Sequence, residues 1–276
     1  MSSVLKKVHD LAKQGFGTGT NELYDRARPS YQSEALAYIR QEVQASSVNI
    51  VEIGAGTGIS TRALLAHPDW SQSVARLRAL EPSEGMRDVF SKTVKDDRVS
   101  IADGTFDTTG VEDGWADLVL VAQAFHWCPD YNAAAAEFAR ILKPTGIVAL
   151  IWNLEDRDAA GWVAQLRDRV ESHESGTPQF RLMLWRQTFD TPNYQSLFQP
   201  HIEKTWERSL PGTLDIVVDR ACSKSYIAVL PENEKKKVVE DVTQIVKTGD
   251  RMTWQDKEKG IFNYPYKTYV VIWKKK

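Results

Sequence analysis

The sequence predicts an α/β fold in which parallel strands alternate with helices. The apolar run Val48–Val51 leads into a glycine-rich turn that ends at Gly58, and a segment of helical composition follows directly. Ala116–Val121 is almost continuously apolar, which is typical of a strand buried on both faces of a parallel sheet. With 276 residues and 42% hydrophobic residues, the chain has enough apolar side chains for the core of one large domain.

Further strands and helices follow in order along the chain. Helices are expected at 34–43, 61–66, 133–142 and 231–246, and strands at 48–51, 76–80, 99–102, 116–121, 146–152, 204–207 and 264–273. Because open parallel sheets bind ligands at the carboxyl ends of their strands, the residues just after each strand are the candidate site.

The turn after the first strand carries Glu52, Gly54, Gly56 and Gly58. A helix that starts behind such a turn offers free backbone N–H groups to a nucleotide or a carboxylate. The dinucleotide pattern Gly-x-Gly-x-x-Gly would need glycine at position 59, which is Ile59. A glycine-rich turn without a ligand remains an alternative.

Three motifs resemble those of class I S-adenosylmethionine (SAM) methyltransferases. They are Glu-x-Gly-x-Gly-x-Gly at 52–58, Glu-Pro-Ser-x-x-Met at 81–86 and Arg-Ile-Leu-Lys-Pro-Thr-Gly at 140–146. The chain is similar to the methyltransferase type 11 group and, within it, to trans-aconitate methyltransferases and related fungal small-molecule enzymes. This resemblance implies SAM as cofactor and S-adenosylhomocysteine as its product.

The resemblance also implies a Rossmann-like, doubly wound sheet of seven strands, mostly parallel, with an antiparallel last strand. We expect a single methyltransferase domain over 1–276, with an N-terminal lid at 1–45. The strand–helix alternation is interrupted at 153–205, and this segment is expected to form a cap after strand five that lines the acceptor pocket.

The cofactor residues follow from the family pattern. Glu52 is matched to the amino group of SAM, Glu81 to both ribose hydroxyls, Met86 to the adenine region, and Asp103 with Gly104 to the adenine ring. The glycines at 54, 56 and 58, together with Gln123 at the end of strand four, complete the sheet edge, and Tyr24, Arg28 and Tyr31 are expected to close over the methionine end. Ordinary loop and surface roles remain alternatives for Glu81, Asp103 and the lid residues.

The acceptor is not identified by the sequence. His126 is the candidate general base because an unperturbed histidine has a pKa of about 6.5, although it could instead pack at the strand edge. Trp127, Trp152, Arg181, Trp185 and Tyr194 are candidate pocket walls, and core packing is an alternative for the tryptophans. Transfer to oxygen, to a carboxylate or hydroxyl, is favoured. Transfer to sulfur or nitrogen, a protein acceptor and a non-catalytic SAM-binding regulator stay open.

Composition limits the other functions. The net charge of −2 favours neither nucleic acid nor an anionic membrane as partner. Cys128 and Cys222 are far apart, and no spacing suggests a metal site. The first residues lack the apolar stretch of a signal peptide. We therefore expect a cytoplasmic enzyme for a small-molecule acceptor, without a metal, and its oligomeric state is left open.

Overall fold

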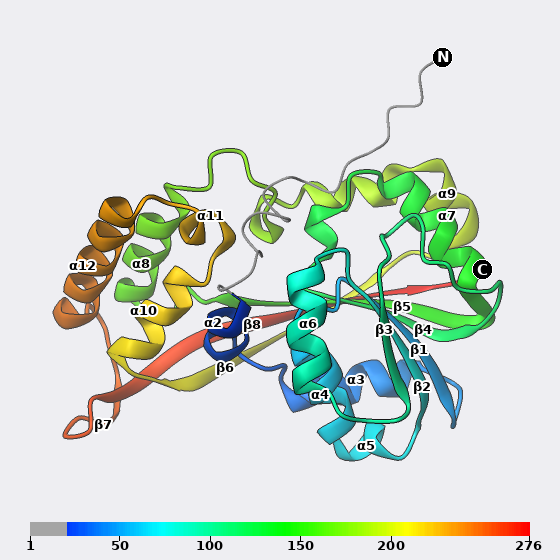
Figure 1. Cartoon of the computed structure of the whole chain (residues 1–276), viewed down its shortest axis with the longest axis horizontal. Helices are drawn as coiled ribbons and strands as arrows, with labels where there is room; N and C mark the ends of the chain where they lie inside the picture. Colours follow the sequence, from blue (N-terminus) through cyan, green and yellow to red (C-terminus); the bar gives the residue numbers. More distant parts are fainter. Residues whose placement is uncertain (1–20) are drawn as a thin grey trace.

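One mixed sheet organises the chain in the computed structural model, which describes residues 21–276 (Figure 1). Within these residues the sheet has eight strands, in the order β3-β2-β1-β4-β5-β8-β6, with β7 paired to β8 outside this path. The five parallel strands are β1 (Val48–Ile53), β2 (Val74–Leu80), β3 (Val99–Ala102), β4 (Ala116–Ala122) and β5 (Leu142–Glu155).

The C-terminal strand runs against its neighbours, as the family pattern implies. β8 (Ile261–Lys274) is antiparallel to β5 and to β6 (Ile202–Gly212). β7 (Trp254–Asp256) is a short strand beside β8 that the sequence did not predict. The predicted fold class is confirmed, with eight described strands instead of the expected seven.

Helices cover both faces of the sheet because alternate side chains of the central strands point to opposite sides. Along β4, Val119 and Val121 belong to one core while Leu118 and Leu120 belong to the other. The first core is covered by α7 (Tyr131–Ile141), η3 (Leu184–Asp190) and α9 (Pro192–Leu197). The second is covered by α3 (Ser33–Glu42), α4 (Ile59–Ala66), α5 (Pro68–Ser71) and the end of α6 (Glu84–Thr93).

A third core lies in a helical lobe to one side of the sheet (Figure 1). The lobe consists of α8 (Gly161–Glu171), α10 (Leu214–Cys222), α11 (Ser225–Ala228) and α12 (Glu232–Thr248). These helices pack on Phe262, Tyr264 and Tyr266, which belong to the part of β8 nearest the lobe.

The segment 153–205, expected to form a cap, is divided between two places. Its helix α8 joins the lobe, whereas η3 and α9 pack on the sheet beside α7. The 3-10 turn η2 (Phe180–Leu182) lies between the two parts. The lobe therefore combines a segment that follows β5 with one that follows β6.

The helix α2 (Asn21–Ala27) lies between the lobe and the sheet and contacts α10 and α6. Arg26 pairs with Asp219 at 3.1 Å, and Asp25 pairs with Arg62 at 2.6 Å. Of the predicted lid at 1–45, α2 bridges the two parts and α3 belongs to the sheet layers, while residues 1–20 lie outside the described residues. Among residues 21–276, no helix is long and apolar enough to cross a membrane.

Candidate functional site

The three glycines after β1 have different reasons to be glycine. All have positive φ, at +72°, +57° and +89° for Gly54, Gly56 and Gly58. A Cβ on Gly54 would lie 2.5 Å from the Cβ of Ala124, and one on Gly58 would lie 2.6 Å from a methyl carbon of Val94. A Cβ on Gly56 would have no heavy atom of the described chain within 4 Å. Gly54 and Gly58 are therefore required by packing, and only Gly56 leaves open space for a ligand.

Glu52 is fully buried beneath this turn, where it is bonded to the start of α4. Its carboxylate accepts hydrogen bonds from the hydroxyl of Ser60 and, at 2.5 Å, from that of Thr61. Burial raises the pKa of Glu52 to about 7, although both hydroxyls lower it. Glu52 thus holds the glycine turn to the helix, a role that the family pattern did not reveal.

Glu81 joins the end of β2 to the same turn. Its carboxylate accepts from the backbone N–H of Gly56 and from that of Ser83, each at 2.9 Å. The side chain is 8% exposed, and burial raises its pKa. Met86, in the first turn of α6, is 3% exposed, and its N–H donates to the hydroxyl of Ser83. Glu81 and Met86 therefore lie together at the carboxyl end of β2, and their roles toward ribose and adenine stay predictions.

The ends of β3 and β4 carry the other predicted cofactor residues. The side chain of Asp103 is exposed and lies 3.7 Å from Arg87, while Gly104 is buried against Leu80. Gln123 has a φ of +55°, in the left-handed region that non-glycine residues rarely adopt. Its side-chain amide exchanges two 2.9 Å hydrogen bonds with the backbone of Asn153, so its polar atoms have partners within the protein.

Two of the residues predicted for the lid, Tyr24 and Arg28, meet the helical lobe, whereas Tyr31 packs against the second core of the sheet. Arg28 lies 4.5 Å from the centre of the Tyr24 ring and donates to the hydroxyl and the carbonyl oxygen of Ser223, at 3.1 and 2.9 Å. Burial and the nearby Arg220 lower the pKa of Arg28. Burial raises the pKa of Tyr31, and Tyr24 and Glu52 add to this effect. α2 and the loop after it thus contribute a cation to the space above the sheet edge.

A pocket opens between the carboxyl ends of the strands and the helical lobe. Six of the predicted residues line it, and they are Tyr24, Arg28, Gln123, His126, Trp127 and Arg181. Sequence reasoning missed the charged and aromatic residues that the lobe contributes, which are Glu171, Glu174, Arg220, Lys224 and Tyr226. One signal of their burial was present: Arg220 falls on the same side of α10 as the buried Val217 and Ala221.

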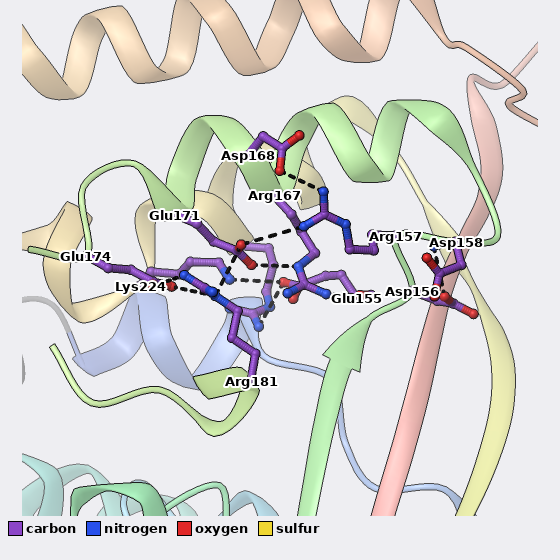
Figure 2. A network of polar contacts seen from close by, with 11 residues as sticks. Glu155, Asp156, Arg157, Asp158, Arg167, Asp168, Glu171, Glu174, Arg181 and Lys224 are labelled. Atoms are coloured by element: carbon purple, nitrogen blue, oxygen red, sulfur yellow. Dashed lines mark hydrogen bonds and ion pairs between the residues drawn. The ribbon is translucent and has the colours of Figure 1, made fainter. Parts of the chain in front are cut away.

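A network of ion pairs forms the lobe side of the pocket (Figure 2). Arg181 lies 3.1 Å from Glu171 and also pairs with Glu174. Arg167 pairs with Glu171 at 2.6 Å.

Behind these residues, Glu155 at the end of β5 lies 2.9 Å from Arg220 and 3.5 Å from Lys224. Although burial opposes it, the charges of Arg220 and Lys224 hold the pKa of Glu155 far below its usual range. Glu155 is therefore an anion, and it offsets one of the two cations beside it.

Positive charge exceeds negative charge among the residues that line the pocket. The lining cations are Arg28, Arg181, Arg220 and Lys224, and the lining anions are Glu171 and Glu174. Within residues 21–276 these groups give 4 − 2 = +2, and the charges of Glu155 and Arg167 behind them cancel, as do those of the paired Arg157 and Asp168. Burial and the neighbouring cations Arg220 and Arg28 lower the pKa of Lys224 to about 8, so its charge is retained at neutral pH.

The histidine predicted as a base is held by a tryptophan. The indole N–H of Trp152 donates to Nδ1 of His126 at 3.3 Å. Burial lowers the pKa of His126 to about 3, and Arg28 adds to this effect. His126 is therefore neutral at physiological pH.

Three of the predicted pocket walls are core residues. Trp152, Trp185 and Tyr194 are 0%, 1% and 4% exposed, and none of them lines the pocket. Trp185 packs on Trp152 with ring centres 4.9 Å apart, and Tyr194 packs edge-on against Trp273 at 5.2 Å. Among residues 21–276, no three His, Cys, Asp or Glu side chains are grouped so that they could hold a metal ion.

Comparison with known proteins agrees with this geometry. A family model described as a methyltransferase domain matches residues 51–150. An uncharacterized methyltransferase-like protein of Schizosaccharomyces pombe is 31% identical over 238 residues, which cover 86% of this chain and 88% of that protein. An uncharacterized methyltransferase of Mycobacterium tuberculosis is 30% identical over 225 residues, covering 82% and 83%.

Solved structures share the fold at low identity. The YcgJ protein from Bacillus subtilis has a TM-score of 0.54 and 18% identity, covering 89% of this chain and 99% of its own. Phosphoethanolamine N-methyltransferase 2 of Haemonchus contortus, in complex with phosphomonomethylethanolamine and S-adenosylhomocysteine, has a TM-score of 0.55 and 14% identity, covering 96% and 59%. With its glycine turn, its sheet order and these relatives, the chain belongs to the class I SAM-dependent methyltransferases.

Proposed function

We propose that this methyltransferase transfers the methyl group of SAM to an oxygen of a small anionic acceptor, with a carboxylate as the preferred group. The observation that carries the proposal is the charge excess of +2 around the pocket, which lies beside the carboxyl ends of the strands. A buried excess of positive charge favours an anion and disfavours a protonated amine.

The residues at the sheet edge fit SAM. Gly56 leaves open space, and Glu81 offers a buried carboxylate directly beside it. Met86 lies in the first turn of the next helix, and Arg28 has no carboxylate partner among the described residues, so it would suit the methionine carboxylate. Bound SAM supplies a methyl group on a positively charged sulfur. With Arg28 assigned to the cofactor, one unbalanced positive charge remains for the acceptor.

A carboxylate also suits the weak basicity of His126. A hydroxyl, thiol or ammonium acceptor must lose a proton before or during transfer, whereas a carboxylate already carries its nucleophilic lone pair. The pKa of His126 is lowered to about 3, so the ring accepts a proton poorly, and its Nδ1 already accepts a hydrogen bond from Trp152. The remaining task of the protein is orientation, which can contribute roughly 7–11 kcal/mol to lowering a barrier.

Relatives at lower identity act on both nitrogen and oxygen, by their names. A sarcosine/dimethylglycine N-methyltransferase of Halorhodospira halochloris is 28% identical over 155 residues, and a malonyl-[acyl-carrier protein] O-methyltransferase of Priestia megaterium is 26% identical over 127. Transfer to nitrogen or sulfur, and a SAM-binding regulator without turnover, are therefore the alternatives to test. We also propose a small acceptor and a cytoplasmic location, without nucleic-acid or membrane partners.

The test is methyl transfer from radiolabelled SAM to a panel of small carboxylic acids, phenols, thiols and amines. If the proposal is correct, carboxylic acids are labelled preferentially, and mild alkali releases the label as volatile methanol, because a methyl ester hydrolyses under these conditions. A label that alkali does not release, on an amine, thiol or phenol, contradicts transfer to a carboxylate. SAM binding without turnover on any acceptor would favour the regulator.

Lys224 provides a matched pair of variants. Lys224→Met should raise KM for the carboxylic acid about tenfold or more, the scale of a lost charge-assisted hydrogen bond, and leave the Kd for SAM unchanged. Lys236→Met, at an exposed lysine of α12, is the control. Because the pKa of Lys224 is lowered to about 8, the wild-type KM should rise above that pH as the charge is lost. Equal KM values for the two variants would remove Lys224 from the acceptor site.

A further inference from the structure

His126 lies in a rigid position at the carboxyl end of β4. It belongs to the 3-10 turn η1 (Phe125–Trp127), which follows Gln123 and its left-handed backbone. The indole that donates to it, Trp152, is fully buried and packs on Phe180 and Trp185, with ring centres 4.7 and 4.9 Å away. Because Trp152 cannot turn without disrupting this core, its N–H stays directed at Nδ1 of His126.

This contact fixes the tautomer of His126. An indole nitrogen donates hydrogen bonds and never accepts them, so Nδ1 must present a lone pair to Trp152. In a neutral imidazole the single ring proton then lies on Nε2. A second proton on Nδ1 would face the indole N–H and add a positive charge near Arg28, so the geometry opposes an imidazolium.

Nε2 has no hydrogen-bond partner within residues 21–276, and His126 lines the acceptor pocket. The other titratable groups that line this pocket come from α2, α8, α10 and α11, from the residues that follow the first three of these helices, and from η2. They are Tyr24, Arg28, Glu171, Glu174, Arg181, Arg220, Lys224 and Tyr226. His126 is thus an N–H donor among charged groups, facing a space that a ligand can enter.

We propose that His126 is a positioning residue, which donates a hydrogen bond from Nε2 to an oxygen of the acceptor and does not act as a general base. The lone pair that a base needs is on Nδ1, and it is occupied by Trp152. For a carboxylate, the bond would go to the oxygen that does not receive the methyl group, leaving the other oxygen free to react. The choice of acceptor oxygen rests on the proposed function, whereas the tautomer does not.

The tautomer can be measured without any acceptor. In ¹⁵N NMR of the intact protein, His126 should show a protonated Nε2 and an unprotonated Nδ1, with no titration between about pH 5 and 9. Trp152→Phe removes the donor to Nδ1, so its spectrum should shift toward a mixture of both tautomers. A wild-type His126 that titrates near pH 6–7, or that is protonated at Nδ1, overturns the proposal.

Kinetics test the donor role. His126→Phe should lower kcat/KM about tenfold or more, the scale of a hydrogen bond to a charged group, with the Kd for SAM and the melting temperature nearly unchanged. His126→Gln, whose amide can donate from near the position of Nε2, should recover most of this loss.

The pH profile separates a donor from a base. A base would give the wild type an acidic limb near pH 6–7 that both variants lack, and this result would overturn the proposal, as would a Gln variant no better than Phe. If His126→Phe does not fold, the Gln variant and the NMR experiment still decide. Labelling of nitrogen or sulfur acceptors would contradict the proposed function but leave the tautomer result intact.

Discussion

Gly56 allows the sharpest test of the cofactor site, because another glycine of the chain matches it in backbone and surroundings. Gly56 has a φ of +57° and Gly110, in the loop between β3 and β4, has a φ of +66°; a Cβ on either one would meet no heavy atom of residues 21–276 within 4 Å. Placing alanine in this left-handed conformation costs roughly 1–2 kcal/mol. For a chain of this length, that lowers the melting temperature by roughly 2–8 °C in either variant.

The two variants should differ in SAM binding. In Gly56→Ala the new methyl group stands in the open space beside Glu81, so the Kd for SAM measured by calorimetry should rise more than about tenfold, the scale of a lost bond to a charged group. Gly110→Ala should bind SAM like the wild type. Gly54→Ala should lose more stability than either, since its Cβ would lie 2.5 Å from that of Ala124. Equal SAM affinity of the Gly56 and Gly110 variants would refute the assignment of the open space to the cofactor.

Three further predictions concern Glu81, Glu52 and Trp185. Glu81→Gln should raise the Kd for SAM about tenfold, and an unchanged Kd by calorimetry would remove Glu81 from the site. The pKa of Glu52 is 4.5 before folding and about 7 after it, so the folded protein binds an extra proton between these values and its free energy of unfolding falls as the pH rises through this range. Between about pH 5 and 7.5, the free energy of unfolding in urea should therefore change less for Glu52→Gln than for the wild type. Equal changes in the two proteins would contradict the shift. Trp185→Ala should lose about 3–5 kcal/mol of unfolding free energy, whereas Leu184→Ala, at an exposed neighbour, should lose little; a loss below about 1 kcal/mol for the tryptophan would mean that it is not a core residue.

The sheet and the candidate cofactor residues at the carboxyl ends of β1 and β2 were predictable because their sequence signals are local. The turn at 54–58 and Glu81 each follow a strand within a few residues, and strand order then brings them together. The packing reasons for Gly54 and Gly58 were not predictable, since they depend on Ala124 and on Val94, which are distant in sequence.

The acceptor side was less predictable for a geometric reason. The aromatics around Trp185 lack the 3.6-residue spacing of an α-helix, which suggested pocket walls. The structure has a 3-10 turn here, and its period of three buries Trp185 and Thr188 together in the core. The lobe residues Arg220 and Lys224 reach the pocket only through the packing of α10 and α11 on β8, which no local pattern encodes.

The position of β8 has a consequence for how the chain folds. β8 is the most C-terminal of the described strands, yet it is the partner of β6, a neighbour of β5 and part of the core of the helical lobe. Until β8 has been synthesised, β6 therefore lacks its partner strand, and the lobe helices lack the strand on which they pack. The pairing of β6 with β8 and the core of the helical lobe must therefore form late and nearly together, because both depend on contacts of high sequence separation. Until then, the apolar faces of β5 and of the lobe helices are open to chaperones and to aggregation, and substitutions in β8 should reduce the yield of folded protein more than substitutions in β3.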